Sequence, residues 1–375
     1  MTEQRSAIVS GGSMGGLFSG FALYQHGWDV NVFEQTAGEL KSRGAGIVAQ
    51  PSMLRYMEEH DIISDGEITT ETNRREYLNR DGSVERKFAD SMTFTSWDAV
   101  YRHLRGAFPD DRYRMGYEVV GVEQHGESVT VEFADGTEKR ADLLVVAEGG
   151  QSDTRKQLLA EPSPEYAGYV AWRGLIDEEA ASGNLIEAFE NTFVFYEGEN
   201  ELILGYLIPG PDGETSRGNR RLNWVWYDNV RDRDRLKELL TDSRGIEHEF
   251  SVPPGELRED VSGQLHEKAN ADLPDCFSKV VTTTPKPFVQ TIYDLSVPKM
   301  AFDRVCLLGD AAFVARPHTA AGTAKAAEDG ISLADALGND EITSALENWE
   351  EKRLEAGERL VSEGIRMGES YMDPN

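Results

Sequence analysis

The stretch that decides the fold is residues 6–34, SAIVSGGSMGGLFSGFALYQHGWDVNVFE. Its apolar start, residues 6–10, ends at the glycine-rich turn GGSMGG. Residues 17–23 then show the spacing of apolar side chains that is typical of a helix, and residues 29–34 alternate between polar and apolar positions. Because a parallel partner strand needs a crossover, usually a helix, this order predicts a βαβ unit with a parallel second strand.

The glycine turn is close to the G-x-G-x-x-G fingerprint of dinucleotide-binding units. Gly11 and Gly16 keep the outer positions, and Ser13 stands at the middle one. The backbone of such a turn approaches a pyrophosphate at the helix N-terminus, and an acid about twenty residues on binds ribose. An ordinary strand-to-helix turn is the alternative. The predicted cofactor contacts here are Gly11, Ser13, Met14, Gly15, Gly16 and Glu34.

Composition limits the partners of the chain. At about 150 residues per domain, its 375 residues allow two or three domains. The net charge of −29 argues against nucleic acid and anionic membranes as partners. Only 11 of the 38 basic residues are Lys, and this acidic, Lys-poor composition indicates adaptation to high salt. An ordinary acidic surface is the alternative.

The two cysteines and the N-terminal residues help to predict the cellular compartment of the protein. Cys276 and Cys306 form no paired motif, which is typical of a reducing interior. The first residues, MTEQR, run directly into the first predicted strand, and no long apolar segment follows. We therefore expect a cytoplasmic protein without a membrane span. The sequence contains neither an HExxH motif nor a Cys-His cluster, so we expect no metal.

Beyond the first unit, the pattern predicts two kinds of sheet. Residues 117–147 indicate an antiparallel meander whose last strand, LLVVA, is parallel and central. Residues 169–228 carry longer, aromatic-rich strands that predict a separate antiparallel sheet. A strand at residues 305–310 and a helix at residues 322–337 predict that the nucleotide-binding part resumes afterwards, and residues 344–372 indicate a helix.

Two later segments give the chain a family resemblance. Residues 142–155, DLLVVAEGGQSDTR, and residues 305–318, VCLLGDAAFVARPH, are similar to the second and third motifs of the flavoprotein aromatic hydroxylases, the single-component FAD monooxygenases. Together with the glycine turn, they stand in the order of that family. Further segments resemble the hydroxypyridine hydroxylases within it, so the resemblance covers nearly the whole chain. These segments are residues 44–51, 166–174, 222–227 and 316–322.

The resemblance implies an α/β fold with three parts. They are a Rossmann-like FAD-binding domain with a parallel sheet, a substrate domain built on an antiparallel β-sheet, and a C-terminal helical segment. The implied boundaries are residues 1–72, 98–165 and 290–340 for the interrupted FAD-binding domain, 73–97 and 166–289 for the substrate domain, and 341–375 for the C-terminal helix.

The resemblance also implies an activity. Such enzymes hold FAD, take electrons from NADH or NADPH as a transient co-substrate, and react with O2 to form a flavin C4a-hydroperoxide that hydroxylates an electron-rich ring. The implied partner is a small aromatic substrate, 2,6-dihydroxypyridine, converted to 2,3,6-trihydroxypyridine, with another hydroxypyridine or a phenol as the alternative. Family members of this type are commonly homodimers. Two other classes stay open: an FAD-dependent reductase or dehydrogenase that inserts no oxygen, and a non-catalytic FAD-binding protein.

The family positions add cofactor contacts. Asp310 is expected to accept hydrogen bonds from ribityl hydroxyls, with a capping or loop Asp as the alternative. A helix that begins near Gly322 would aim its positive end at flavin N1 and the C2 carbonyl, with tight packing as the alternative role of the small residues there. Gln50 and Arg43 are also predicted cofactor contacts. A polar residue at a strand end is an equally good account of Gln50, and a solvated surface Arg is an equally good account of Arg43. The remaining implied contacts are Gly149, Gly309, Pro317, Ala321 and Thr323.

The chain departs from the family pattern at several positions. Glu148 stands where the second motif has Asp, Phe313 where the third often has His, and Ala324 where Asn is frequent. At the start of a helix near residues 96–105, the family often has an Arg that contacts the pyrophosphate. This chain has Ser96 or Trp97 at that position, and Arg43 is the candidate substitute.

Three residues are expected at the substrate. His318 could accept a phenolic proton or hydrogen-bond a ring oxygen, with a structural His beside the flavin as the alternative. Tyr206 and Arg173 stand on strands expected to roof the flavin, with packing or structural pairing as the alternative. Trp224 and Trp226 share one face of their strand and Val225 lies on the other, and we expect the two Trp side chains to pack in the core.

Overall fold

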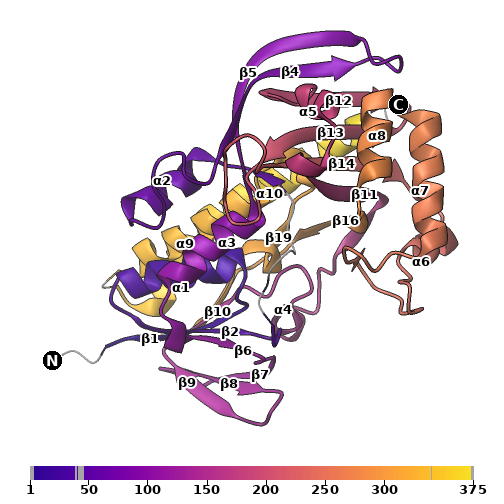
Figure 1. The fold of residues 1–375 in the computed structure, drawn as a ribbon. Helices are drawn as coiled ribbons and strands as arrows, with labels where there is room; N and C mark the ends of the chain where they lie inside the picture. The colour runs from indigo at the N-terminus through magenta and orange to yellow at the C-terminus, as the bar shows by residue number, and fades with distance from the viewer. Residues whose placement is uncertain (1–3, 39, 41–45, 339, 373–375) are drawn as a thin grey trace.

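The computed structural model describes residues 4–38, 40, 46–338 and 340–372, and it contains two large sheets joined by helices (Figure 1). The first sheet has six strands in the order β17-β18-β10-β1-β2-β6. Its neighbours are parallel except at β17. The predicted βαβ unit is confirmed, because α1 (Met14–Gln25) connects β1 to a parallel β2. The strands are β1 (Ser6–Ser10), β2 (Asp29–Glu34), β6 (Tyr113–Met115), β10 (Leu143–Val146), β17 (Ala301–Phe302) and β18 (Val305–Leu307).

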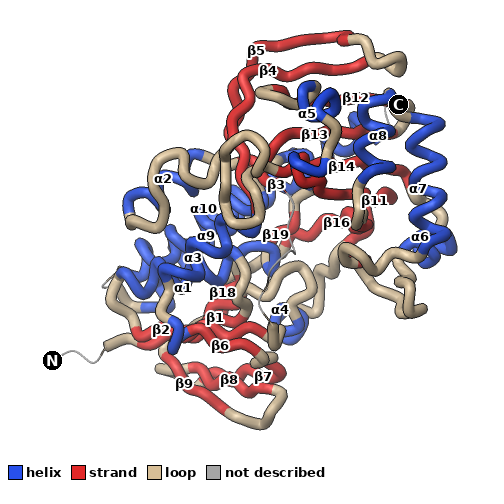
Figure 2. Tube along the Cα trace, viewed as in Figure 1, coloured by secondary structure: helices blue, strands red, loops and turns tan. Residues whose placement is uncertain are grey.

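Helices cover one side of this sheet, and a three-stranded sheet covers the other (Figure 2). α1 packs closely on α9 (Gly322–Leu337), since a Cβ at Gly330 would lie 2.6 Å from the backbone nitrogen of Ser19. On the other side, the ring of Phe133 lies 4.7 Å from that of Phe33. The remaining helices of this half are α2 (Pro51–Glu59), α3 (Trp97–Ala107) and α4 (Asp153–Leu158), and the small sheet holds β7 (Val119–Gln124), β8 (Val129–Phe133) and β9 (Glu138–Ala141).

The meander predicted for residues 117–147 needs one correction. Its third strand is β9. The predicted last strand, β10, is parallel and central as expected, but it belongs to the six-stranded sheet, where it pairs with β1 and β18. The change of sheet occurs at Asp142, whose Oδ2 accepts hydrogen bonds from the Ser6 backbone nitrogen at 2.7 Å and the Ser6 Oγ at 2.8 Å. The short polar strand β9 carries little apolar periodicity, which is why the pattern did not reveal it.

The second sheet has ten strands, nine of them in the order β15-β16-β11-β14-β13-β12-β4-β5-β3, with β19 beside β16. Its centre confirms the predicted antiparallel sheet, although β12 pairs in parallel with β4. The hairpin of β4 and β5 projects from the molecule (Figure 1). The strands are β3 (Gly46–Val48), β4 (Thr70–Leu78), β5 (Val84–Ser96), β11 (Glu165–Asp177), β12 (Thr192–Gly198), β13 (Glu201–Ile208), β14 (Arg221–Asn229), β15 (Ser251–Val252), β16 (Phe288–Ser296) and β19 (Phe313–Val314).

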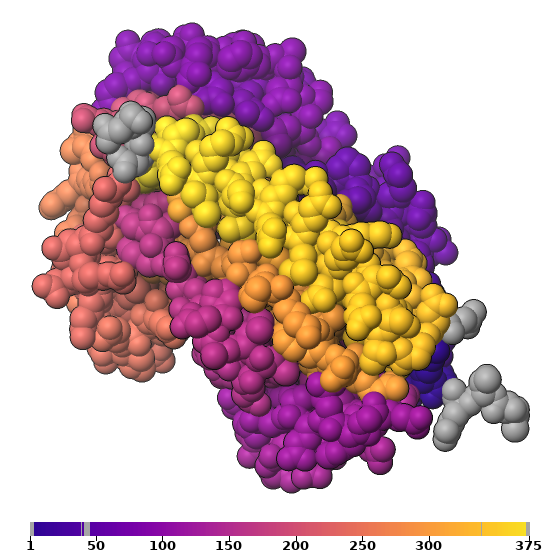
Figure 3. Space-filling view, turned by 180° about the vertical axis from the view of Figure 1, so that it is seen from behind, coloured from indigo at the N-terminus to yellow at the C-terminus, as the bar shows by residue number. Residues whose placement is uncertain are grey.

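Two sets of helices flank the second sheet. One set packs against its outer face, where Trp224 and Trp226 are fully buried, as expected. The long helix α10 (Ile342–Met372) crosses the back of the molecule along both sheets (Figure 3). No helix of the described ranges is long and apolar enough to cross a membrane. The outer helices are α5 (Gly183–Glu187), α6 (Arg233–Leu239), α7 (Glu259–Asp272) and α8 (Asp275–Thr283).

The domain boundaries stay a prediction. Strand β3, from the first expected segment of the FAD-binding domain, pairs with β5 of the ten-stranded sheet. Strand β16 begins at Phe288 and continues past the expected boundary at residues 289 and 290.

Candidate active site

A cavity of about 880 Å³ lies between the two sheets. This volume is near the top of the range of about 300–1,000 Å³ that is usual for ligand sites. The ends of β1, β2, β10 and β18 supply one half of its lining, and the inner face of the ten-stranded sheet supplies the other. Of the predicted site residues, the following line it: Gly11, Ser13, Met14, Gly15, Glu34, Gln50, Gly149, Arg173, Tyr206, Gly309, Asp310, Pro317, His318, Ala321, Gly322 and Thr323.

Two predicted residues are not among the lining. Arg43 lies outside the described residues. Gly16 is not among the lining residues, and a Cβ there would come within 1.8 Å of the Gly11 carbonyl oxygen, so the lack of a side chain lets helix and strand approach closely. Its contact with a cofactor stays a prediction. Gly11 itself has a φ of +102°, and a Cβ there would meet the Ala147 carbonyl oxygen at 2.3 Å. The tight turn therefore requires glycine at both positions.

The N-terminus of α1 opens into the cavity. Ser13 is its N-cap and makes no side-chain capping bond, and the first turn carries no acidic side chain. Backbone N–H groups and the positive end of the helix dipole favour an anion at such a site. Glu34, at the end of β2, uses Oε2 to accept a hydrogen bond from the Gly12 N–H at 2.8 Å and Oε1 to accept one from the Thr36 N–H at 2.9 Å. The carboxylate thus holds the glycine turn while it lines the cavity.

Glu148 has a structural role that sequence reasoning missed. Its Oε1 accepts hydrogen bonds from Ser10 Oγ at 2.6 Å and Thr154 Oγ1 at 2.7 Å, and its Oε2 accepts one from Ser152 Oγ at 2.6 Å. The carboxylate therefore ties the ends of β1 and β10 to the start of α4. The hydroxyl residues that follow Glu148 were the available signal, but the contact with Ser10 depends on parallel pairing of distant segments.

The turn at Gly309 and Asp310 is held from below by charged side chains. Lys325 Nζ donates to the Gly309 carbonyl at 2.7 Å, and Asp329 Oδ2 accepts from the Gly309 N–H at 2.9 Å. Asp310 projects into the cavity, and its pKa is raised by burial, with Lys325 opposing and Asp329 adding to the shift. Arg353 of α10 donates to Asp329 Oδ1 at 2.6 Å and so links the C-terminal helix to this turn.

A second helix N-terminus faces the same cavity. α9 begins at Gly322 after Ala321, which provides no side-chain cap, and its first turn has no acidic residue. Ala320 adopts a left-handed φ of +53°, and a Cβ on Gly322 would meet no atom within 4 Å. Two uncapped helix N-termini, a turn that requires glycine and a carboxylate open to the cavity fit a dinucleotide with an electron-accepting ring.

The inner face of the ten-stranded sheet forms the other end of the cavity. Tyr206 stacks on Phe94 with ring centroids 4.0 Å apart, and the ring of Tyr227 lies 4.2 Å from that of His318. Burial raises the pKa of Tyr206 and raises that of Tyr227 to about 12, so both are neutral phenols. Arg173 Nε is buried without a hydrogen-bond partner, and no ion pair to Arg173 exists among the described residues. A charged donor without a protein partner is an expected feature of a ligand site.

His318 is neutral in this environment. Burial lowers its pKa to about 3, and the positive charges of Arg316 and Arg173 contribute to the shift. Gln50, which also lines the cavity, donates from Nε2 to the Ala320 carbonyl at 3.4 Å. Met367 and Tyr371 of α10 also line the cavity. The sequence did not reveal these two residues, because α10 is brought next to the ten-stranded sheet only when the chain folds.

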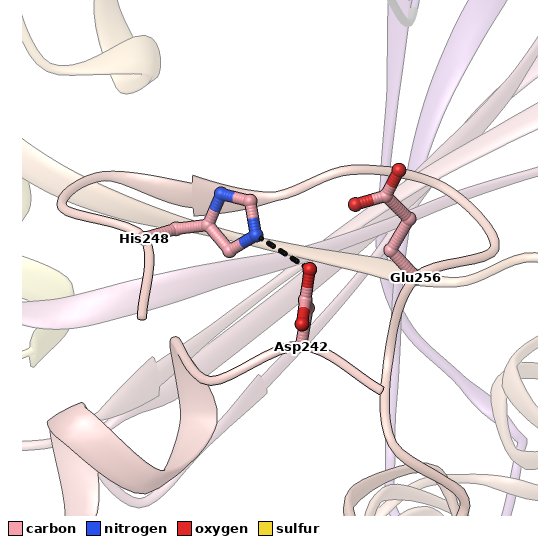
Figure 4. A group of neighbouring side chains, drawn as sticks. All are labelled: Asp242, His248 and Glu256. Carbon is pink, nitrogen blue, oxygen red and sulfur yellow. Dashed lines mark hydrogen bonds and ion pairs between the residues drawn. The ribbon is translucent and has the colours of Figure 1, made fainter. Parts of the chain in front are cut away.

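A group of polar side chains lies away from the cavity, between α6 and α7 (Figure 4). Asp242, His248 and Glu256 place ligand atoms within 4.8 Å of one another. However, Arg244 donates from Nη2 to Asp242 Oδ2 at 2.8 Å and to Glu256 Oε2 at 2.8 Å, and His248 Nε2 lies 3.1 Å from the same Asp242 oxygen. Because a guanidinium already neutralises both carboxylates, the group is an ion-pair network that fastens the loop.

Comparisons with known proteins agree with this geometry. A family model described as FAD binding domain-like matches residues 166–294. The chain is 36% identical over 372 residues to 2,6-dihydroxypyridine 3-monooxygenase of Paenarthrobacter nicotinovorans, covering 98% of this chain and 91% of that protein. It is 26% identical over 378 residues to 6-hydroxynicotinate 3-monooxygenase of Pseudomonas fluorescens, covering 96% and 90%. The solved structure of 2,6-dihydroxypyridine-3-hydroxylase from Arthrobacter nicotinovorans matches with a TM-score of 0.94 at 33% identity, covering 99% of this chain and 94% of that one.

The predicted fold class, cofactors and enzyme class are confirmed by these similarities. They extend over nearly the full length of both partners, and therefore over both sheets and all three motifs. The chain belongs to the family of single-component FAD-dependent aromatic hydroxylases, which use NAD(P)H and O2.

Proposed function

We propose that this hydroxylase acts on 2,6-dihydroxypyridine and forms 2,3,6-trihydroxypyridine. The observation that carries the proposal is the polar end of the cavity, where Arg173 and His318 stand among aromatic side chains. Aromatic walls suit the faces of a flat ring, and the two polar side chains suit its oxygen atoms. The 36% identity to an enzyme named for this substrate supports the choice of ring.

The cofactor and the protein divide the work. When bound, FAD accepts a hydride from NADH or NADPH and activates O2, of which one atom enters the ring and the other leaves as water. The balance is one substrate, one NAD(P)H, one proton and one O2, giving one hydroxylated ring, one NAD(P)⁺ and one water. Binding, orientation and exclusion of bulk water are left to the residues of the chain.

The cofactor contacts follow from the residues around the cavity. The turn at Gly11 and the N-terminus of α1 would hold the pyrophosphate, and Glu34 would bind ribose hydroxyls next to it. Asp310 would accept hydrogen bonds from the ribityl chain. The N-terminus of α9 at Gly322 would stabilise negative charge on the pyrimidine side of the ring.

The substrate contacts lie at the sheet end. Arg173 would pair with an oxygen of the ring, since its Nε is buried and no carboxylate of the described residues pairs with its guanidinium. Tyr206 and Tyr227 are buried, and they line the cavity with Phe193 and Phe195. These aromatic side chains would exclude water from the reacting atoms.

Oxygen uptake by the FAD-loaded protein tests the proposal directly. The assay uses NADH or NADPH in high salt with 2,6-dihydroxypyridine, and 2,6-dimethoxypyridine serves as a control ring that lacks both hydroxyl groups. We expect the dihydroxy ring alone to stimulate uptake and to yield hydroxylated product. Stimulated uptake that yields only hydrogen peroxide would indicate that the substrate is a related hydroxypyridine or phenol instead. No stimulation by any hydroxyarene, with reducible flavin present, would refute the proposal.

The sequence-based expectations on habitat and assembly also stay predictions. They are a cytoplasmic location, adaptation to high salt and a homodimer. Sedimentation of the FAD-loaded protein in high salt tests the last of these, and a monomer at all concentrations would contradict it.

A further inference from the structure

His318 stands at the end of a chain of polar contacts that leads out of the cavity. The Tyr169 hydroxyl lies 2.9 Å from His318 Nε2. The Arg316 guanidinium lies over the Tyr169 ring, 5.5 Å from its centroid. The guanidinium is held in turn by Asp294, which accepts from Arg316 Nη2 at 2.7 Å and from Nε at 3.0 Å. All four side chains are buried or half-buried, so their hydrogen bonds are shielded from water.

The direction of the hydrogen bond to His318 follows from burial. In the hydrogen bond between Tyr169 and His318, either the hydroxyl or Nε2 could donate. The Tyr169 hydrogen needs an acceptor, because Tyr169 is 1% exposed. Among the described residues, the only acceptor recorded for it is Nε2 of His318. The buried Tyr169 hydrogen is satisfied when Tyr169 donates to Nε2 of His318.

This direction determines the state of the imidazole. Since Nε2 accepts, a neutral His318 must carry its hydrogen on Nδ1. No described residue is recorded as a hydrogen-bond partner of Nδ1, and Nδ1 is not among the buried atoms without a partner. His318 lines the cavity. The Nδ1–H group is therefore free to donate to a ligand in the cavity.

We propose that His318 serves the hydroxylation as a hydrogen-bond donor from Nδ1, and that Tyr169 is a positioning residue that holds this tautomer. The proposal rests on the proposed function and deepens it, because it defines the oxygen that the site receives. That oxygen is an acceptor: a carbonyl, as in the pyridone form of the substrate, or an oxyanion. Arg173, which also faces the cavity, offers a second donor and favours the same class of ligand.

The environment supports donation over proton uptake. Burial and the nearby positive charges of Arg316 and Arg173 disfavour the imidazolium ion and lower the pKa of His318. A base that must accept a proton from the ring would work against these charges, whereas a neutral donor does not. His318 thus stabilises the electron-rich form of the ring without taking its proton.

Helix α10 keeps the chain of contacts in place. A Cβ on Gly368 would lie 2.7 Å from Arg316 Nη1 and 2.7 Å from the Tyr169 hydroxyl. The helix can therefore close over these groups only because this position is glycine.

The first test needs no substrate. Nitrogen NMR of the FAD-loaded protein with labelled histidine, assigned with His318→Ala, reports which ring nitrogen carries the hydrogen. We expect Nδ1 to be protonated and Nε2 to be the acceptor at neutral pH. A protonated Nε2, or an imidazolium ion, would overturn the proposal whatever the substrate is, and so would separate its failure from a failure of the proposed function.

The second test uses variants. Tyr169→Phe removes the hydroxyl that faces His318, and Tyr166→Phe is a matched control on the same strand, since the Tyr166 hydroxyl donates to the Val230 carbonyl at 2.8 Å instead. With the hydroxyarene that gives the strongest stimulation, we expect Tyr169→Phe to lower kcat/KM about tenfold with FAD content unchanged. We expect the control to retain full kcat/KM.

A double-mutant cycle separates positioning from a general structural effect. If Tyr169 acts through His318, Tyr169→Phe should have no further effect on kcat/KM in a His318→Ala background. Equal losses in both backgrounds would refute the positioning role. An unchanged kcat/KM for Tyr169→Phe in the wild-type background would do the same.

Discussion

Strand β14 places Trp224 and Trp226 on one face of the ten-stranded sheet and Val225 and Tyr227 on the other. All four are buried, but the two faces differ in whether their polar side-chain atoms have hydrogen-bond partners. On the outer face, the indole nitrogen of Trp224 donates to Thr284 Oγ1 at 2.8 Å. That of Trp226 donates to a carboxylate oxygen at 3.1 Å. On the inner face, Arg173 Nε has no hydrogen-bond partner among the described residues, and the Nδ1–H inferred for His318 is open to the cavity.

The difference teaches that burial alone does not separate a core from a site. Both faces exclude water, and both carry large aromatic side chains. The two outer indoles find acceptors within the protein and so add stability, whereas the inner face leaves donors for a ligand. Mutations on the two faces should therefore act on different quantities.

The largest effect is expected on the outer face. Trp226→Ala should lower the free energy of unfolding by about 3–5 kcal/mol, because it removes a fully buried indole and leaves a cavity. Phe88→Ala, at an aromatic residue that is 49% exposed, should change it by less than about 0.5 kcal/mol. Chemical denaturation monitored by circular dichroism measures both. A small loss for Trp226→Ala would mean that the outer face is not a core.

The inner face should show the opposite balance. Arg173→Met should weaken substrate binding by about 1.5–3 kcal/mol, roughly 10–100-fold in Kd, since it removes a charged donor. Its free energy of unfolding should stay equal or rise, because no carboxylate in the part of the chain that the structure describes loses a partner. Substrate titration followed by flavin absorbance measures the first quantity.

Arg221→Met provides the matched control for Arg173→Met. Arg221 Nη1 lies 3.4 Å from Asp98 Oδ2, and both side chains are buried. Removing one partner of a buried pair is expected to cost about 3–5 kcal/mol of stability. If Arg173→Met destabilised the fold as much as Arg221→Met does, the contrast between the two faces would fail.

The free energy of unfolding should depend on pH through His318, which lies on the inner side of the sheet. Its folded pKa is lowered to about 3 from 6.5, so the unfolded chain binds more protons between these values. The free energy of unfolding then rises with pH, and the contribution of His318 is lost as the pH falls from 6.5 towards 3. Between pH 8 and pH 5 the wild type should lose about 2 kcal/mol that His318→Asn does not lose. Parallel slopes for the two proteins would contradict a buried, neutral histidine.

Salt should have the smallest effect on the difference between variants. With a net charge of −29, the wild type should melt at a higher temperature in multimolar than in low salt, since screening relieves repulsion between carboxylates. The stability difference between wild type and Trp226→Ala should change by less than about 0.5 kcal/mol, because the indole is buried. Equal melting temperatures at low and multimolar salt would contradict the predicted adaptation to high salt.

Local patterns predicted much of the fold. The alternation in residues 29–34 and the glycine turn before them predicted β2 and α1, because strand pleat and helix spacing are written into neighbouring residues. The helix expected at residues 322–337 begins and ends as predicted. Strand β9 was missed because it is short, polar and mostly exposed, which leaves no apolar period to detect.

The candidate site was predictable where a motif is continuous. Gly11, Glu34 and Asp310 belong to continuous motifs, and each lines the cavity. Tyr227 and Tyr371 also line it, but they come from β14 and α10, and no local pattern connects those segments.

By itself, the sequence determined the βαβ unit, the family and the alternating faces of β14, since each depends on residues that are close along the chain. Only the tertiary structure decided which face of the ten-stranded sheet became a core and which became a cavity wall. It also decided that Tyr169 and Arg316 meet at His318 beneath α10. The physical reason is that hydrogen bonds and burial at these positions join segments far apart in sequence, and such contacts exist only after the two sheets and α10 have packed together.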